Sequence, residues 1–519
     1  MLDILIRGAR IVDGSGKAAF TGDIGVRQNR IAQVASAIHD EEAVRIIDAR
    51  SLTVVPGFVD MHRHGDLIPF TQPPGNEELR QGITSYINGN CGFSATPSSD
   101  GHFEDLVQYA KPILGLIPPS LKGISENAFF AEATKAALYS NVGYLVGAGA
   151  LRVFEKGFEP GPLSDREMEG VCERLRALLD AGALGLSMGL MYVPENYTPT
   201  LQLAQMCSVP ASMGRIVTVH MRGEGISLLS SVDEVIDLAQ RTGGKFHISH
   251  LKAAGKRCWN DLLPRALQRI DHARARGIDI SFDVYPYCAG STALYTLFPP
   301  NAQIGGVKRL VECCQDRDFR LHMRRELAVE QSAWDNLIAS IGWQNVTIVG
   351  AKDQRALGRT ILEIAQDRGL DPVDCAMDLL VENNGNVPMV IHSMSEADME
   401  MALCAPGAIV ISDALYGGGI PHPRRYGAMA RAIHHYGRIY GQEKMVRACS
   451  ALPAERMGLQ ARGMIQKGAF ADLLLLDMDR FADRADYSQP THMPDGIEMA
   501  IVNGKLALQS DMPLGAHGI

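Results

Sequence analysis

The chain has 519 residues, of which 46% are hydrophobic, and it carries a formal net charge of −9 at pH 7. This length exceeds the ~200–250 residues of a large single domain, so we expect one large domain and at least one smaller module. The absence of basic runs argues against a nucleic-acid partner, and no apolar stretch reaches the ~18–20 residues needed to span a membrane.

The N-terminal segment shows no features of a secretory leader. Its sequence, MLDILIRGARIVDG, lacks a basic start, a long apolar run and a small-residue cleavage site. The 10 cysteines are scattered, apart from the adjacent pair Cys313 and Cys314, and do not form a disulfide framework. Both observations predict a protein of the reducing cytoplasm.

Both ends of the chain are predicted to be β-structure. The apolar run Arg10–Val12 ends in the turn signal DGSG. Near the C-terminus, Ala471–Asp477 has the pattern of a buried strand, and Ile497–Val502 leads into a tight-turn Asn-Gly pair. We therefore expect residues 1–53 and 456–519 to meet as one small sheet domain.

The long middle, residues 54–455, is predicted to be a parallel β/α barrel. Short apolar runs alternate with helical patterns such as Arg166–Gly182, which has helical periodicity and a glycine stop. Repeated strand–helix units imply parallel strands, and eight runs match the strand count of a (β/α)8 TIM-like barrel. The runs are Val54–Asp60, Ser85–Asn90, Val142–Ala148, Leu184–Met188, Ile216–Met221, Phe246–His250, Ile278–Val284 and Ala408–Asp413.

One stretch of the middle, residues 296–400, is too long for a single strand–helix unit. It contains two further strand candidates, at Val346–Val349 and Met389–Ile391. We expect it to be an insertion that lies over the barrel mouth, where the active sites of such barrels are found.

His62 and His64 directly follow the first barrel run, in DMHRHGD. Side chains two residues apart on an extended strand point the same way, so both histidines can face one metal ion. An H-x-H pair alone can also be two ordinary loop histidines. Its place after LTVVPGFVD favours a metal site, because the ligands of a barrel enzyme lie at strand ends.

Cys91 ends the second run, in NGNCGFS. Gly89 and Gly92 permit a tight backbone around it, and a thiolate is a strong zinc ligand. Most of the other cysteines are expected to be inert and buried. Cys91 differs from them because it ends a barrel strand among glycines.

His220 and His250 end two successive strand candidates, about one β/α unit apart. His247 competes with His250, but it lies deeper in its strand, and we expect it to be a core histidine on the other face. Asp413 ends the last run, where it could cap a helix. It could equally point at the histidines, hold a metal-bound water and shuttle its proton.

This set of residue types favours zinc. Cysteine and histidine ligands that leave one position open lower the pKa of a zinc-bound water to near ~7. Hydrolysis of an unactivated amide requires such a water. The sequence therefore predicts a zinc-dependent hydrolase with a small-molecule substrate.

Over nearly its whole length, the chain resembles the D-aminoacylases (N-acyl-D-amino-acid deacylases) of the amidohydrolase superfamily. The resemblance implies a β/α barrel with a small β-sandwich built from both chain ends. It also implies hydrolysis of the amide bond of N-acyl-D-amino acids, giving a carboxylate and a free D-amino acid. The motifs are VVPGFVDMHRHGD, GNCGFS, GLSMGLMYVPENY, VHMRGEG, ISHLK, FDVYPYCAGST, ISDALYG, HPRRYG, GAFADLLLLD and IVNG.

The resemblance implies two metal positions. Cys91, His220 and His250 would hold one tightly bound zinc ion. A second position, which is weaker or empty, would be formed by His62, His64 and Asp413. Asp413 would also be the general acid/base.

The resemblance further implies which residues surround the substrate. Lys252, Tyr285 and Ser291 match positions near the substrate carboxylate, and Tyr192 is a candidate pocket wall. Arg63, beside His62, departs from the usual small or polar residue and is expected to add a cation near the weaker metal position. Met188 and the glycine-rich segment Ala414–Gly419 also depart from the family pattern.

Two alternatives stay open from the sequence. A related amidohydrolase could open a cyclic amide or cleave a dipeptide with a D-residue, because fold does not determine function. A non-catalytic barrel is the weaker alternative, since no candidate ligand is missing. The sequence does not define the acyl group, the amino-acid side chain or the number of subunits.

Overall fold

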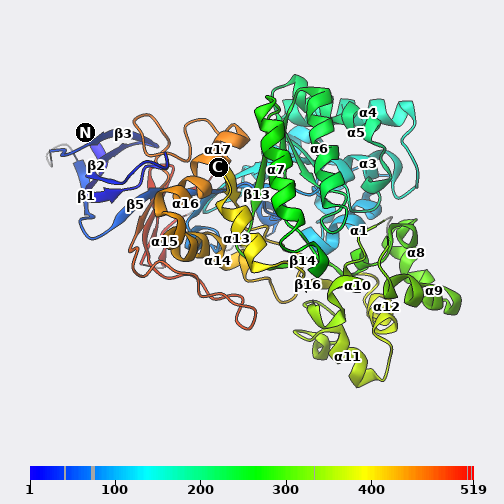
Figure 1. The fold of residues 1–519 in the computed structure, drawn as a ribbon. Coiled ribbons are helices and arrows are strands. Elements are labelled where there is room, and N and C mark those ends of the chain that lie inside the picture. Colours follow the sequence, from blue (N-terminus) through cyan, green and yellow to red (C-terminus); the bar gives the residue numbers. More distant parts are fainter. Residues whose placement is uncertain (40–42, 72–75, 332–333, 511, 516, 519) are drawn as a thin grey trace.

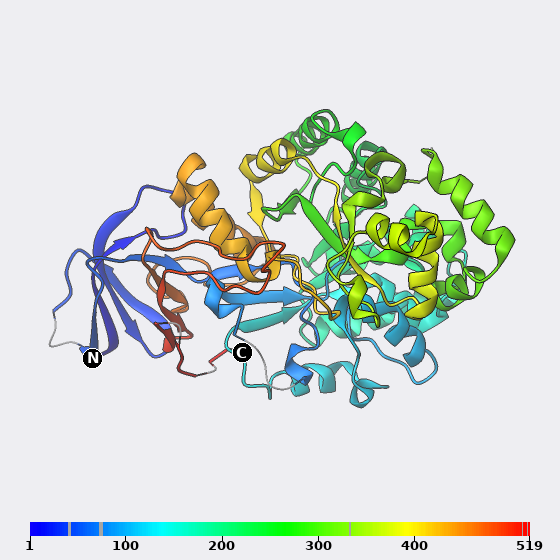
Figure 2. The same ribbon diagram turned by 90° about the horizontal axis from the view of Figure 1, so that it is seen from below.

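The computed structural model describes residues 1–39, 43–71, 76–331, 334–510, 512–515 and 517–518. The N-terminal and C-terminal strands lie together at one end of the molecule (Figure 1), and a group of helices from residues 306–382 lies at the opposite end (Figures 1 and 2). The barrel lies between them. Among the described residues, no helix combines the length and apolar character needed to cross a lipid bilayer.

The two ends of the chain form one nine-stranded sheet. Strand β5 pairs antiparallel with β18, with Val54 opposite Leu475, and this pairing joins the two chain ends. The predicted sheet domain from both ends is therefore present. Its strands are β1 (Leu2–Ile11), β2 (Phe20–Arg27), β3 (Arg30–Ala35), β4 (Ala43–Asp48), β5 (Thr53–Pro56), β18 (Leu473–Leu476), β19 (Ile497–Val502), β20 (Lys505–Gln509) and β21 (Met512–Pro513).

The predicted run Val54–Asp60 is two strands in the structure. Its first half, β5, belongs to the end sheet, and its second half, β6 (Phe58–Asp60), begins the barrel. Gly57 lies between them and packs closely on β7: a Cβ at this residue would come within 2.1 Å of Thr84 Oγ1. The chain thus changes sheet at a residue where no side chain fits.

The barrel closes through backbone hydrogen bonds between its first and last strands. His64 N donates to Ala414 O at 2.9 Å, and Asp413 N donates to His62 O at 3.0 Å. The barrel confirms the predicted fold class. After β6, its strands are β7 (Ile83–Asn88), β8 (Asn141–Tyr144) continued by β9 (Val146–Gly147), β10 (Gly185–Gly189), β11 (Ile216–His220), β12 (Lys245–Ile248), β13 (Ile280–Val284) and β17 (Ala408–Val410).

Helices cover the outside of the barrel, and several of them are amphipathic. The predicted helix near Arg166–Gly182 is α4 (Asp165–Asp180), which begins with a capping box in which Ser164 and Glu167 bond each other's backbone N–H groups. Its apolar face packs into the main core, as do the faces of its neighbours. These are α3 (Ala148–Lys156), α5 (Thr200–Ser212), α6 (Leu228–Thr242), α7 (Leu262–Ala275), α13 (Glu396–Cys404), α14 (Arg424–Arg431), α15 (Gly437–Tyr440), α16 (Gln442–Cys449) and α17 (Ala451–Met457).

Extra segments stand on the side of the barrel where its strands end. After β7, α1 (Phe103–Leu114) and α2 (Glu126–Ala133) add a small apolar cluster. After β13, a three-stranded antiparallel sheet and five helices have a core of their own. This sheet starts with β14 (Ala289–Ala293), so the extra structure begins before the predicted residue 296. Its other elements are α8 (Gly306–Cys313), α9 (Arg317–Ala328), α10 (Leu337–Ile341), β15 (Val346–Ile348), α11 (Ile361–Arg368), α12 (Pro372–Glu382) and β16 (Pro388–His392).

Candidate metal centre and active site

The candidate metal ligands gather at the carboxyl ends of the barrel strands, and all six are buried. They follow or end different strands: His62 and His64 follow β6, Cys91 follows β7, His220 ends β11, His250 follows β12, and Asp413 follows β17. Because parallel strands end at one rim of the barrel, residues far apart in the sequence meet there.

The first ligand group contains Cys91 between two imidazoles. Its Sγ lies 3.2 Å from His62 Nε2 and 3.4 Å from His250 Nε2. The His220 ring lies 4.3 Å from the His250 ring, measured between centroids. The structure thus brings Cys91, His220 and His250 together, as the sequence predicts, and adds His62 to the same cluster.

The second ligand group contains His62, His64 and Asp413, whose ligand atoms all lie within 4.8 Å of one another. Asp413 Oδ1 is 3.2 Å from His64 Nε2 and 3.5 Å from His62 Nε2. His62 therefore belongs to both groups, and the two candidate positions are adjacent.

Three of these residues have a left-handed backbone. The φ angles are 54° at Cys91, 36° at His250 and 48° at Asp413. Each costs ~1–3 kcal/mol for a residue with a side chain, and such strain is concentrated at functional sites. The turn at Cys91 depends on Gly89, where a Cβ would come within 2.1 Å of Leu145 O.

The electrostatics of the cluster favour ionised ligands. Burial by itself would raise the pKa of the Cys91 thiol, but His62, His250 and His220 lower it well below its usual value. Burial also opposes ionisation of Asp413, yet Arg424, His62 and His64 lower its pKa well below the usual range. A thiolate and a carboxylate therefore stand among imidazoles.

These donors fit zinc. Thiolate and imidazole are its usual protein ligands. The Nδ1 atom of His220 is buried and has no hydrogen-bond partner within the described chain. Buried polar atoms without partners are unfavourable, and a bound ion removes that cost.

Asp283, on β13, is a buried residue that the sequence did not single out. Its Oδ2 lies 3.2 Å from His62 Nδ1 and 2.9 Å from His247 Nε2, and its Oδ1 accepts the backbone N–H of His250. Because Nδ1 of His62 is held by Asp283, its Nε2 faces Cys91 and is free to bind a metal ion. His247 also bonds Ser281 Oγ at 2.6 Å and lies outside the ligand groups. The sequence offered one signal for Asp283. It lies two residues before Tyr285, and side chains two residues apart on an extended strand point the same way, so Asp283 could face the site as well.

Glu224 is a second residue that sequence reasoning missed. Its Oε1 lies 3.0 Å from His250 Nδ1 and 2.5 Å from Lys252 Nζ. Lys252 Nζ also lies 2.8 Å from His250 Nδ1. Lys252 therefore reaches the pocket, but its charge is paired with Glu224 rather than free for a substrate carboxylate.

Arg424, in the HPRRYG motif, is the third missed residue. It is 1% exposed, and its guanidinium lies 2.9 Å from Asp413 Oδ2 and 4.5 Å from the centre of the Tyr285 ring. Its Nε and Nη1 have no hydrogen-bond partner among the described residues. A buried guanidinium with free donors is suited to bind an anion. The motif was visible in the sequence, but nothing in it showed which of its two arginines faces the site.

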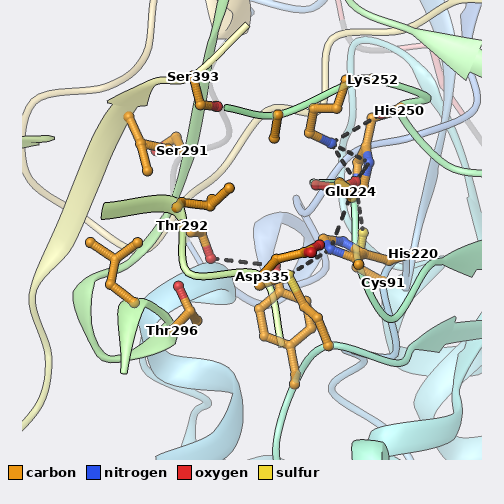
Figure 3. A pocket seen from close by; sticks show the side chains of 18 of the residues that line it. Cys91, His220, Glu224, His250, Lys252, Ser291, Thr292, Thr296, Asp335 and Ser393 are labelled. Carbon is orange, nitrogen blue, oxygen red and sulfur yellow. Dashed lines mark hydrogen bonds and ion pairs between the residues drawn. The ribbon is translucent and has the colours of Figure 1, made fainter. Parts of the chain in front are cut away.

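One cavity contains both the metal cluster and the predicted substrate residues. Figure 3 shows Cys91, His220, Glu224, His250 and Lys252 along one wall, with Ser291, Thr292 and Thr296 across the pocket. Tyr285, Tyr192 and Arg424 line the same cavity. Tyr192 is linked to the opposite wall, since its hydroxyl lies 3.3 Å from Thr292 Oγ1, whereas Ser291 Oγ donates to Met389 O at 3.0 Å.

The expectation that Arg63 adds a cation near the second metal position is wrong. Its guanidinium bonds Glu78 Oε1 at 2.9 Å and the Tyr416 hydroxyl, and it lies 3.4 Å from Asp60 Oδ2. Adjacent residues of an extended chain point to opposite faces, so Arg63 points away from His62 and His64. Its positive charge is neutralised by the carboxylates of Asp60 and Glu78.

The chain is similar to known proteins over most of its length. A model of the amidohydrolase family matches residues 152–507. N-acyl-D-glutamate deacylase of Alcaligenes xylosoxydans xylosoxydans is 31% identical and covers 97% of this chain and 93% of the relative. D-aminoacylase of the same organism is 29% identical over 99% of this chain and 96% of the relative.

One solved structure is similar to this chain over its full length. It is N-acyl-D-glutamate deacylase from Bordetella bronchiseptica, complexed with zinc and a phosphonate inhibitor. It superposes with a TM-score of 0.84 at 28% identity, covering 100% of this chain and 98% of that one. A D-hydantoinase superposes with a TM-score of 0.55 at 14% identity, a likeness that concerns the fold alone.

Proposed function

The chain belongs to the amidohydrolase family, and within it to the D-aminoacylases, and from this premise we propose that it hydrolyses the amide bond of N-acyl-D-amino acids. The products are a carboxylate and a free D-amino acid. Zinc is the cofactor.

One observation supports this proposal most directly. A buried cluster of cysteine and histidine ligands opens into the same cavity as Arg424, a buried guanidinium with unpartnered donors. An N-acyl amino acid carries both an amide and a free carboxylate, so it can use both features at once. A hydantoin or dihydropyrimidine ring has no carboxylate for Arg424, and this disfavours cyclic amides of that kind.

We assign the metal ligands as the sequence predicts. Cys91, His220 and His250 would hold the tightly bound zinc, and His62, His64 and Asp413 would form the weaker position. Bound zinc polarises an amide carbonyl and lowers the pKa of a coordinated water to near ~7. The ionised Asp413 carboxylate would accept a proton and return it to the leaving amine.

We assign the α-carboxylate to Arg424, together with the hydroxyl groups of Tyr285 and Ser291. The guanidinium and the Tyr285 hydroxyl supply donors for the carboxylate, and the Ser291 hydroxyl would turn to it from Met389 O, to which it donates in this structure. Lys252 lies near them, but its pairing with Glu224 makes it a secondary contributor. Tyr192, bonded across the pocket to Thr292, forms a wall that limits the substrate's position.

The test combines metal analysis with stereochemistry. The purified enzyme should contain at least one zinc equivalent and hydrolyse N-acetyl-D-amino acids in strong preference to their L-enantiomers. Cys91→Ala should lose the tightly bound zinc. Cys207→Ala is the matched control, because Cys207 is equally buried but bonds Met188 Sδ away from the cluster.

Two outcomes would contradict the proposal. Cys91→Ala that retains a full zinc equivalent would rule out this ligand set. A zinc-loaded enzyme that hydrolyses a hydantoin but no N-acyl-D-amino acid would replace the substrate class.

A further inference from the structure

We propose that the pocket selects N-acyl-D-amino acids with an uncharged, apolar side chain, and that Asp335 is the residue that excludes acidic side chains. This inference rests on the proposed function, because it concerns the part of the cavity left after the metal cluster and the α-carboxylate are placed. The relatives do not decide the matter, since their names include both an N-acyl-D-glutamate deacylase and a D-aminoacylase.

The cavity offers no free cation to a second carboxylate. Its described lining contains three cationic side chains, Arg222, Lys252 and Arg424. Arg222 is occupied by Glu234 at 2.9 Å and by the carbonyl oxygens of Asn196 and Thr198. Lys252 is paired with Glu224, and Arg424 is shared between Asp413 and the α-carboxylate of the substrate. An acidic substrate side chain would therefore be buried without a counter-charge, which is strongly unfavourable.

Asp335 adds a negative charge to the lining of this cavity. Its two oxygens accept the backbone N–H groups of Gly225 at 2.8 Å and Ser227 at 3.0 Å, just before α6. It has no ion pair with any residue that the structure describes. A Cβ at residue 223 would come within 2.4 Å of Asp335 Oδ2, so Gly223 makes this close approach possible. The carboxylate is thus fixed in place.

The rest of the lining is uncharged. Beside the hydroxyl groups of Thr292, Thr296 and Ser393, it contains large hydrophobic side chains contributed by α1, the loop after β10, and the extra segment after β13. An apolar substrate side chain would be stabilised by burial against them. These residues are Ile113, Met191, Leu297, Phe298, Trp334 and Leu337.

The experiment compares an apolar, a neutral polar and an acidic substrate side chain, of which the last two are isosteric. The zinc-loaded enzyme is assayed for kcat/KM with N-acetyl-D-leucine, N-acetyl-D-glutamine and N-acetyl-D-glutamate. We expect the leucine derivative to exceed the glutamate derivative at least ~100-fold, because an uncompensated like charge is strongly disfavoured. The glutamine derivative should exceed its glutamate isostere by at least ~10-fold.

Asp335→Asn isolates the contribution of Asp335. It should reduce the glutamine-to-glutamate ratio several-fold, because the neighbouring negative charge is gone. Asp233→Asn is the matched control, since Asp233 lies on α6 in an exposed ion pair with Arg269 and does not line this cavity. It should leave the ratio unchanged.

The outcomes separate this inference from the proposed function. Hydrolysis of the glutamate derivative as fast as the glutamine derivative would overturn the inference while the deacylase function stands. An unchanged ratio in folded Asp335→Asn would remove Asp335 as the determinant. If Asp335→Asn fails to fold, the wild-type ratio still decides whether acidic side chains are excluded. A zinc-loaded enzyme inactive on all three substrates would overturn the proposed function itself.

Discussion

Replacing Arg424 by methionine tests which residue recognises the substrate carboxylate. Arg424 is 1% exposed and has unpartnered Nε and Nη1 donors, whereas Lys252 is held by Glu224. Loss of one partner of a buried charge pair costs about 2–5 kcal/mol. At 1.4 kcal/mol per factor of ten, kcat/KM for the free acid should fall roughly 30- to 4000-fold.

A neutral substrate separates binding of the carboxylate from other effects. Arg424 also pairs with Asp413, so Arg424→Met will lower activity on every substrate to some degree. N-acetyl-D-leucinamide lacks the carboxylate charge. Its kcat/KM should therefore fall only through the disturbed Arg424–Asp413 pair. The ratio of the losses for acid and amide therefore reports recognition of the carboxylate alone.

Two further variants complete the assay. Lys252→Met should show a smaller selective loss than Arg424→Met. Arg425→Met is the neighbouring control, because Arg425 bonds Glu77 and packs on the Tyr416 ring instead of lining the cavity. Equal losses for acid and amide in Arg424→Met would refute the assignment, and a larger selective loss in Lys252→Met would transfer the role to Lys252.

Asp413→Asn should reduce turnover ~100- to 10,000-fold while zinc content and Tm stay close to wild type; a variant with more than about a tenth of wild-type turnover would exclude a general acid/base role. Asp283→Asn loosens the carboxylate contact to His62 Nδ1 and should weaken metal binding ~10- to 100-fold in a chelator competition, and unchanged affinity would leave Asp283 a purely structural role. Burial raises the pKa of Glu195 from 4.5 to about 8, so its contribution to stability is full below pH 4.5 and is lost as the pH rises toward 8. Glu195→Gln keeps an acceptor for Gly189 N–H and cannot ionise, so its Tm should exceed the wild-type Tm at pH 8 and match it near pH 4.5; a difference independent of pH would contradict this reasoning.

The barrel and its rim could be predicted because local patterns determine them. Apolar runs followed by polar residues indicated strand ends, and parallel strand ends meet at one rim, so the proximity of Cys91, His220 and His250 followed from topology. The division of Val54–Asp60 between two sheets did not follow, because the two halves pair with different strands, β5 with β18 and β6 with β7, and neither partner is adjacent in the sequence.

The missed residues were charged side chains whose partners come from distant segments. Glu224, Asp283 and Arg424 all lie in motifs that carry the resemblance, but charged residues are usually exposed to solvent, and the motifs do not show which side chains face the site. Their roles arise only where the barrel closes: Asp283 contacts His62 from the first strand, and Arg424 contacts Asp413 from the last. The same limit explains Arg63, whose partner Glu78 lies in a separate segment.

The carboxylates around the ligands explain how the site can be ordered before a metal binds. Asp283 holds Nδ1 of His62, and Glu224 holds Nδ1 of His250, so the Nε2 atoms of both rings are directed at Cys91. Fixing a ring nitrogen in this way selects the tautomer that leaves the other nitrogen free to bind a metal. The left-handed backbone at Cys91 and His250 turns both side chains inward at the rim, at a conformational cost that the surrounding strands must offset. Because this conformational cost is part of the free energy of folding, it does not reduce the affinity for zinc. Removal of either carboxylate should therefore weaken metal binding more than it lowers the stability of the fold.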